Sequence, residues 1–231
     1  MTEASRGTVI FDLDGTLVDS APDLADALDI LLAERGLAPV GLDAARQMIG
    51  HGIAELVRKG LLARGQTPPP AELKAATERF LRHYTAHLSR KSLPYPGAAE
   101  AVDTLRRSGW RLVVCTNKLE AAARALLRDL DLLHAFALVA GPDTFGAAKP
   151  DPMHLLRCLP DLPRDRHPVV VVGDSEVDIA AARAAVLPVI AVRWGYARRP
   201  LHELAPDRIA DDFDQVPALV EALSAPTPGQ V

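Results

Sequence analysis

The feature that most constrains the fold is a set of short apolar runs rich in β-branched residues. Four are clear, at residues 8–11, 111–115, 169–172 and 188–192, and a weaker fifth lies at 136–140. Each run is apolar at consecutive positions, so both faces of each strand should be buried, as in a parallel sheet. Helical patterns lie between most of the runs. The alternation predicts an α/β fold with a doubly wound parallel sheet of about five strands.

The segment between the first and second apolar runs has a different pattern. Its leucines recur at helical spacing, it contains no strand-like run, and Pro68, Pro69 and Pro70 interrupt it. An all-helical segment placed after the first strand is expected to form a domain of its own. We therefore predict an α-helical cap domain at residues 19–94, inserted into an α/β core made of residues 1–18 and 95–231.

Composition excludes several classes of function. The net charge is −4 and no long basic run occurs, which argues against nucleic-acid binding because phosphate backbones select Lys and Arg clusters. The apolar runs are far shorter than the roughly 20 residues of a membrane-spanning helix. Cys115 and Cys158 are the only cysteines, too few for a disulfide framework, and residues 1–7 lack the apolar stretch of a signal peptide. A cytoplasmic protein is the resulting prediction.

Two carboxylates follow the first strand at once. Asp12 and Asp14 are separated by one residue, and on a strand such residues point to the same side. Two like charges held side by side repel one another, so the arrangement needs a reason. A divalent cation is the commonest one, and hard oxygen ligands suit Mg²⁺.

Other polar residues follow the later strands. Thr116 and Asn117 follow the second clear run, Asp174 follows the third with Asp178 four residues on, and Lys149 lies in a loop before a proline. Ligands of open α/β sheets bind beyond the carboxyl ends of the strands. These side chains should therefore meet in one site that contains carboxylates, an amine, a hydroxyl and an amide.

Such a set of groups suits phosphoryl transfer. Asp12 is placed to attack phosphorus, because carboxylates serve as phosphoryl acceptors. Asp14 is placed to protonate the leaving oxygen and then to deprotonate the water that opens the acyl phosphate. Lys149 and the Thr116 hydroxyl would bind phosphate oxygens, while Mg²⁺ would offset the repulsion among the carboxylates, Asp174 included.

These residues resemble the four motifs of the haloacid dehalogenase superfamily, in the same order. The similar stretches are residues 12–20, Thr116-Asn117, Lys149-Pro150, and Gly173-Asp174-Ser175 followed by Asp178. The resemblance implies that Asp12 is the nucleophile and Asp14 the acid and base, and that Thr116 and Lys149 bind phosphate. It further implies Mg²⁺ bound by the Asp12 side chain, the Asp14 backbone carbonyl and Asp174, with Asp178 holding a metal-bound water or orienting Lys149.

The chain also looks like the phosphoglycolate phosphatase-like branch of that superfamily. The helical insert, an Arg followed by a Gly-x-Gly turn at residues 46–52, and the Thr116-Asn117-Lys118 sequence are similar to it. Residues 141–143 (Gly-Pro-Asp) depart from the usual paired glycines. The resemblance implies hydrolysis of a small phosphorylated metabolite, foremost 2-phosphoglycolate. Its carboxylate would need donors from the cap, and Arg46 and His51 are the candidates, beside Asn117 from the core.

Alternatives remain open at this point. Arg46 is also typical of a solvated helix residue, and His51 of a glycine-flanked turn. Asp19 and Ser20 have a structural explanation as a hinge or helix N-cap, so we leave them out of the site. Another small phosphate ester or a sugar phosphate is an alternative substrate. A phosphomutase shares the core motifs, a 2-haloacid dehalogenase lacks the second carboxylate, and a non-catalytic binding protein would not need every motif residue. The sequence leaves open whether the protein is a monomer or a homodimer.

Overall fold

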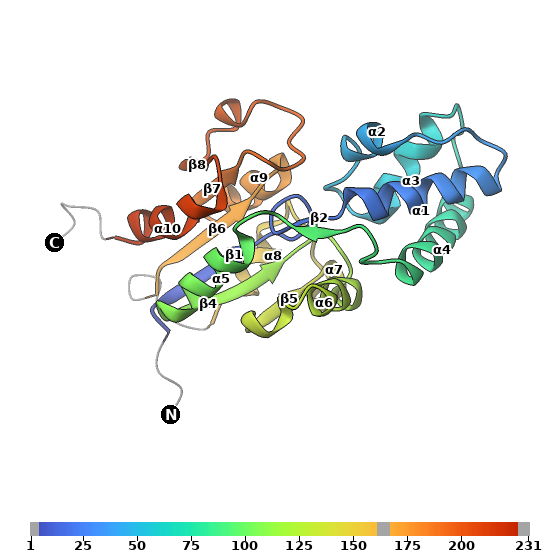
Figure 1. The fold of residues 1–231 in the computed structure, drawn as a ribbon. Coiled ribbons are helices and arrows are strands. Elements are labelled where there is room, and N and C mark those ends of the chain that lie inside the picture. Colours follow the sequence, from blue (N-terminus) through green and yellow to red (C-terminus); the bar gives the residue numbers. More distant parts are fainter. Residues whose placement is uncertain (1–4, 161–166, 226–231) are drawn as a thin grey trace.

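The computed structural model of the protein describes residues 5–160 and 167–225. Its centre is a parallel six-stranded sheet with the strand order β5-β4-β1-β6-β7-β8 (Figure 1). β1 (Gly7–Phe11) lies in the middle, between β4 (Trp110–Cys115) and β6 (Val169–Gly173). The remaining strands are β5 (Leu138–Ala140), β7 (Val189–Val192) and β8 (Arg208–Ala210). The predicted α/β fold with a parallel sheet is confirmed.

The expected number of about five strands is one too low for the described residues. The missed strand, β8, pairs with β7 at the edge of the sheet. It has only three residues, and its first, Arg208, is exposed while only the last is fully buried. A short edge strand that faces solvent does not carry the continuous apolar run by which the inner strands were predicted.

Both faces of the sheet are buried, as the apolar runs predicted. Val9 and Phe11 belong to the hydrophobic cluster on one face, and Ile10 between them belongs to the cluster on the other. Such alternation follows from the two-residue repeat of a strand. One face is covered by α5 (Ala98–Arg107), α6 (Glu120–Asp129) and α10 (Val216–Ser224), the other by α8 (Pro152–Leu156) and α9 (Glu176–Ala184).

The helical insert, defined here as residues 20–92, lies to one side of the sheet (Figure 1). The chain enters it from β2 (Val18–Asp19) and leaves it into β3 (Leu93–Pro94), and these two short strands pair antiparallel. Residues 42–62 form two helices rather than one, because Gly50 and Gly52 between them have positive φ angles of 110° and 84°. The four helices are α1 (Ala21–Glu34), α2 (Leu42–Arg46), α3 (Ile53–Leu62) and α4 (Pro70–Ala86).

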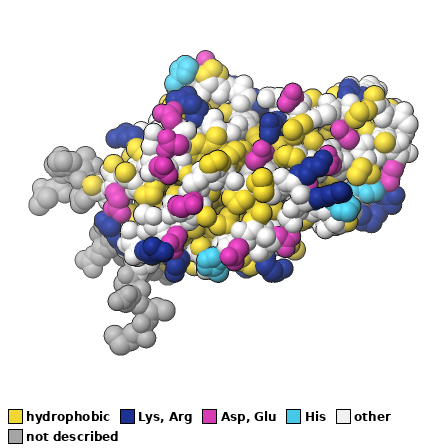
Figure 2. Space-filling model, in the orientation of Figure 1, with side chains coloured by type: hydrophobic (Ala, Val, Ile, Leu, Met, Phe, Trp, Pro, Cys, Tyr) yellow, Lys and Arg dark blue, Asp and Glu magenta, His cyan; other side chains and the backbone are white. Residues whose placement is uncertain are grey.

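Short elements complete the described chain. They are α7 (Pro142–Phe145) and the 3₁₀ segments η1 (Leu133–Ala135), η2 (Leu201–Leu204) and η3 (Phe213–Gln215). None of the helices in the described ranges is long and apolar enough to cross a membrane. Figure 2 shows basic and acidic side chains interspersed on the face in view, so that face offers no continuous basic strip for a phosphate backbone.

Candidate active site

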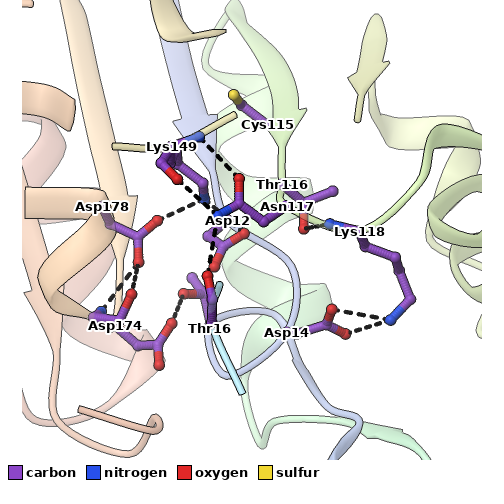
Figure 3. A network of polar contacts seen from close by, with 12 residues as sticks. Asp12, Asp14, Thr16, Cys115, Thr116, Asn117, Lys118, Lys149, Asp174 and Asp178 are labelled. Atoms are coloured by element: carbon purple, nitrogen blue, oxygen red, sulfur yellow. Dashed lines mark hydrogen bonds and ion pairs between the residues drawn. The ribbon is translucent and has the colours of Figure 1, made fainter. Parts of the chain in front are cut away.

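The carboxyl end of β1 delivers Asp12 to the middle of the sheet edge. The Asp12 backbone N–H donates to the Val172 carbonyl at 2.9 Å, which continues the pairing with β6. Lys149 reaches over from the loop after α7 and contacts two carboxylates. Its Nζ lies 2.8 Å from Asp12 Oδ1 and 2.5 Å from Asp178 Oδ1 (Figure 3). All three side chains are buried, so the topology brings together three residues far apart in sequence.

Asp178 has two functions in the structure. Its Oδ1 accepts from Lys149, and its Oδ2 accepts from the Ser175 N–H at 3.1 Å and the Ser175 hydroxyl at 2.6 Å. The second set of bonds caps the start of α9. Asp178 can therefore orient Lys149, as the resemblance implies, and cap α9 at the same time, because each role uses a different oxygen.

Asp174 is held beside this pair by its own set of donors. The Thr16 hydroxyl donates to Asp174 Oδ1 at 3.1 Å and the Tyr196 N–H donates to Oδ2 at 2.7 Å. Gly15 has φ +89°, and a Cβ there would lie 2.5 Å from Asp174 Oδ2. The glycine of the first motif thus allows the turn and also leaves room for this carboxylate.

The three carboxylates form a compact acidic group. Oxygen atoms of Asp12, Asp174 and Asp178 all lie within 4.8 Å of one another. Burial, with repulsion from Asp178 added, raises the pKa of Asp12 from 3.8 to about 7 although Lys149 opposes the rise. Burial, with repulsion from Asp178 and Asp12 added, raises the pKa of Asp174. Burial alone would lower the pKa of Lys149, but Asp12 and Asp178 outweigh it and raise the pKa.

Three buried carboxylates face a single ammonium in this group. The excess of negative charge in a buried place is unfavourable unless a cation offsets it. The donors are all oxygens, which is the set that Mg²⁺ prefers. Asp12, Asp174 and Asp178 therefore fit a divalent cation. Of the four predicted metal-site residues, only Asp14 has a side chain outside the group.

The Asp14 side chain turns away from Asp12, toward Lys118 (Figure 3). Lys118 Nζ lies 2.9 Å from both carboxylate oxygens of Asp14, and the Ser20 hydroxyl donates to Oδ1 at 2.5 Å. Burial would lower the pKa of Lys118, but the Asp14 carboxylate and Tyr84 outweigh it and raise the pKa. Ser20 occupies the N-cap position of α1, yet its side chain makes no cap bond.

Sequence reasoning missed these two partners of Asp14. In the sequence, Lys118 was noted only as the last residue of the Thr116-Asn117-Lys118 stretch that resembles the phosphoglycolate phosphatase-like branch. Ser20 was interpreted as a hinge residue or helix N-cap. A signal was available for Lys118, because it is the third polar residue in a row after an apolar strand. Ser20 gave no signal beyond its helix-capping residue type.

A cavity of about 30 Å³ lies between the core residues of this site and the helical insert, and both line its wall. A space of this size admits only one or two water molecules. The core side of its wall consists of Asp12, Asp14, Thr116, Asn117 and Lys118. The insert side consists of Leu24, Ile49, Gly50, Gly52, Ile53 and Leu56. Thr116 therefore faces the same space as the two aspartates of the first motif.

The two predicted cap contacts do not line this cavity. Arg46 Nη2 bonds to Asp19 Oδ2 at 2.8 Å, at the hinge between core and insert. The His51 ring lies 3.4 Å from Arg198 Nη2, so this contact joins the insert to the core. Burial and Arg198 lower the pKa of His51. In this arrangement of the insert, both side chains are engaged elsewhere.

Asn117 connects three segments through its amide. Its Nδ2 donates to the Gly50 carbonyl at 3.0 Å and to the Lys149 carbonyl at 2.9 Å. Its Oδ1 accepts from the Lys149 N–H at 2.9 Å. Both amide hydrogens are thus used, so the side chain fixes the Lys149 loop and the insert loop. Its predicted contact with substrate stays a prediction.

Comparison with known proteins identifies the family of this chain. A sequence model of the haloacid dehalogenase-like hydrolase family matches residues 9–192. The phosphoglycolate phosphatase of Mesorhizobium japonicum is 41% identical over 210 residues, which cover 91% of this chain and 92% of the relative. That of Agrobacterium fabrum is 43% identical over 215 residues, or 93% and 92%. The chain belongs to the haloacid dehalogenase-like hydrolase family.

The fold is also similar to that of solved structures. A crystal structure of a predicted phosphoglycolate phosphatase from Haemophilus somnus superimposes with a TM-score of 0.86 at 28% identity. The match covers 94% of this chain and 99% of that one. Because almost the whole of both chains is matched, the similarity includes the helical insert as well as the sheet.

Proposed function

We propose that the protein is a Mg²⁺-dependent phosphate monoester hydrolase that converts 2-phosphoglycolate and water to glycolate and phosphate. The observation that carries the proposal is Asp12, a buried carboxylate that lines the cavity and is held by Lys149. Relatives named phosphoglycolate phosphatase match more than nine-tenths of the chain, which supports this substrate among small phosphate esters.

The chain's own residues account for two steps. In the first, an Asp12 oxygen bonds to phosphorus, the ester P–O bond breaks, and the leaving oxygen takes a proton from the Asp14 carboxyl. In the second, water attacks the phosphorus of the aspartyl phosphate, its proton passes to Asp14, and the Asp12 carboxylate is released. Lys149 and the Thr116 hydroxyl bind the phosphate oxygens, where charge is spread in the transition state.

The proposed Mg²⁺ belongs to the acidic group. Asp12 and Asp174 would hold it directly, together with the Asp14 backbone carbonyl, while Asp178 keeps Lys149 in place. When bound, the ion supplies positive charge against the carboxylates and the phosphate dianion. Without that charge, a phosphate dianion would enter a site that is already negative.

We propose that residues 19–94 act as a cap over the core of residues 1–18 and 95–231. The cavity of about 30 Å³ is too small for a phosphate ester, since it admits only one or two waters. We infer that the cap moves away for substrate to enter. Its return excludes bulk water while the phosphoryl group is transferred.

The two free buried thiols, Cys115 and Cys158, support a reducing cytoplasmic location.

A substrate panel tests the function. Purified protein with Mg²⁺ is assayed for phosphate release from 2-phosphoglycolate, sugar phosphates and other small esters, with Asp12→Asn as the inactive control. We expect the largest kcat/KM for 2-phosphoglycolate. Release from none of the esters would overturn the hydrolase assignment. Bisphosphate-dependent isomerisation of a sugar phosphate in place of hydrolysis would identify a phosphomutase.

A further inference from the structure

Lys118 is a buried lysine whose contacts come from three separate parts of the chain. Its side chain is 1% exposed. Its Nζ lies 2.9 Å from each oxygen of Asp14 and 4.8 Å from the centre of the Tyr84 ring. Asp14 follows β1, Lys118 follows β4, and Tyr84 is on α4 in the helical insert. A buried ammonium is costly unless such partners surround it.

We propose that Lys118 is the positioning residue for Asp14: its ammonium holds both side-chain oxygens of Asp14 at the cavity wall, in place to take the proton of the hydrolytic water. The inference rests on the proposed function. It assigns Lys118 to the second step, in which the Asp14 side chain must face the attacking water. Lys118 acts through Asp14 rather than on the phosphate.

The contacts of the ammonium favour this assignment over substrate binding. A lysine has three N–H donors. Two are directed to the Asp14 oxygens, and the Tyr84 ring occupies the remaining side through a cation–π contact. No donor is left over for an incoming carboxylate or phosphate. Lys149 differs, because its Nζ binds the nucleophile Asp12 itself.

Asp14 is fixed at two points that depend on the insert. Ser20, at the start of α1, donates to Asp14 Oδ1 at 2.5 Å. Lys118 holds both Asp14 oxygens and contacts Tyr84, which is wholly buried within the insert and stacked on Phe80. The position of Asp14 therefore depends on the insert being seated against the core.

The test is Lys118→Met, which keeps the length of the side chain and removes its charge. With 2-phosphoglycolate, we expect kcat to fall about 100-fold, the size of a general-base contribution, and KM to fall with it, because slower breakdown of a covalent intermediate lowers both. With p-nitrophenyl phosphate, whose phenolate leaves without a proton, the variant should release a burst of nitrophenol equal to the enzyme concentration. The burst reports aspartyl phosphate that forms but is not hydrolysed.

Three further variants complete the design. Lys118→Arg should recover at least a tenth of the wild-type kcat, because it restores the charge. Lys118→Gln replaces the Met variant if the latter does not fold, as judged by thermal unfolding, and the same burst is expected. Lys91→Met removes a lysine from an exposed pair with Asp26, where Nζ lies 2.6 Å from Oδ2, and should leave kcat and KM unchanged.

Two results would overturn the inference while leaving the proposed function intact. In one, wild-type protein is active and Lys118→Met retains its kcat. In the other, Lys118→Met raises KM for 2-phosphoglycolate alone, with no burst, which would make Lys118 a ligand of the substrate carboxylate. Absence of activity in the wild-type protein would count against the proposed function itself.

Discussion

The two walls of the active-site cavity differ in kind. The core wall is polar and charged and consists of side chains from the strand ends, with Asp12, Asp14 and Lys118 among them. The insert wall is made of aliphatic side chains, such as Ile49 and Ile53, and of glycine backbone. The core residues are held by hydrogen bonds at fixed distances, whereas the insert side chains meet the cavity through packing, with the Gly50 backbone carbonyl bonded to the core by Asn117.

The core wall therefore carries the reacting groups, and the insert wall encloses them. A strand end in a buried sheet fixes a side chain precisely enough for proton and phosphoryl transfer. Aliphatic side chains offer no reacting group, but they exclude water and strengthen the electrostatic interactions inside. We therefore expect substitutions on the core wall to affect kcat most, and substitutions on the insert to affect substrate choice or stability.

Asp12→Asn should have the largest effect. It removes the nucleophile and should lower kcat by roughly 10⁴-fold or more, as for other nucleophiles. The stability of the folded protein should instead rise. The folded-state pKa of about 7 lies above the ordinary 3.8, so ionising Asp12 destabilises the fold increasingly as pH rises through that window. The variant should therefore melt at a higher temperature than wild type at pH 8 without Mg²⁺.

Asp174→Asn should weaken Mg²⁺ binding by about 10- to 100-fold, the range for a disturbed metal ligand set. Thermal unfolding with and without Mg²⁺ measures this without any assay of activity, because a bound ligand raises the melting temperature by mass action. Asp14→Asn is the matched control, since its side chain lies outside the acidic group and its backbone carbonyl is unchanged. Equal loss of the Mg²⁺ effect in both variants would contradict the assignment.

Arg46→Ala should have a small effect on catalysis. Arg46 is held by Asp19 in a partly exposed ion pair, and such pairs contribute up to ~1 kcal/mol. We expect kcat/KM for 2-phosphoglycolate to fall less than about fivefold, and the same for His51→Ala. A large rise in KM confined to substrates with a carboxylate would show that the insert rearranges and brings these side chains to the substrate.

Glu34→Gln should change only stability, and only above acidic pH. The Arg79 guanidinium, with His83 adding to it, lowers the pKa of Glu34 from 4.5 to about 2. Because the folded-state pKa is the lower one, ionised Glu34 stabilises the fold above pH 4.5 and loses this contribution as the pH falls toward 2. Wild type should melt slightly above the variant at pH 7 and match it at low pH.

The sequence predicted those parts of the fold and site that depend on local pattern. The inner strands were found because each is apolar on both faces. Asp12, Lys149, Asp174 and Asp178 were placed together because parallel strands end at one edge of a sheet. In the structure Lys149 contacts Asp12 and Asp178, and an oxygen of Asp174 lies within 4.8 Å of both carboxylates. Their catalytic roles remain proposals.

What the sequence could not predict depends on contacts between distant segments. No local pattern reports that Ser20 turns from its helix to Asp14, or that Lys118 reaches Tyr84 on α4. Arg46 and His51 were candidates because of their chemistry and loop, but their partners, Asp19 and Arg198, decide where they point. The separation of Asp14 from the other carboxylates is likewise set by Lys118.

The pairing of β2 with β3 has a consequence for how such a protein changes over time. Val18 lies opposite Pro94, and Asp19 opposite Leu93, so the two ends of the helical insert are neighbours. A segment whose ends are adjacent can be exchanged as a unit without altering the path of the remaining chain. New substrate preferences are then accessible by recombination at this junction, while the reacting residues keep their geometry.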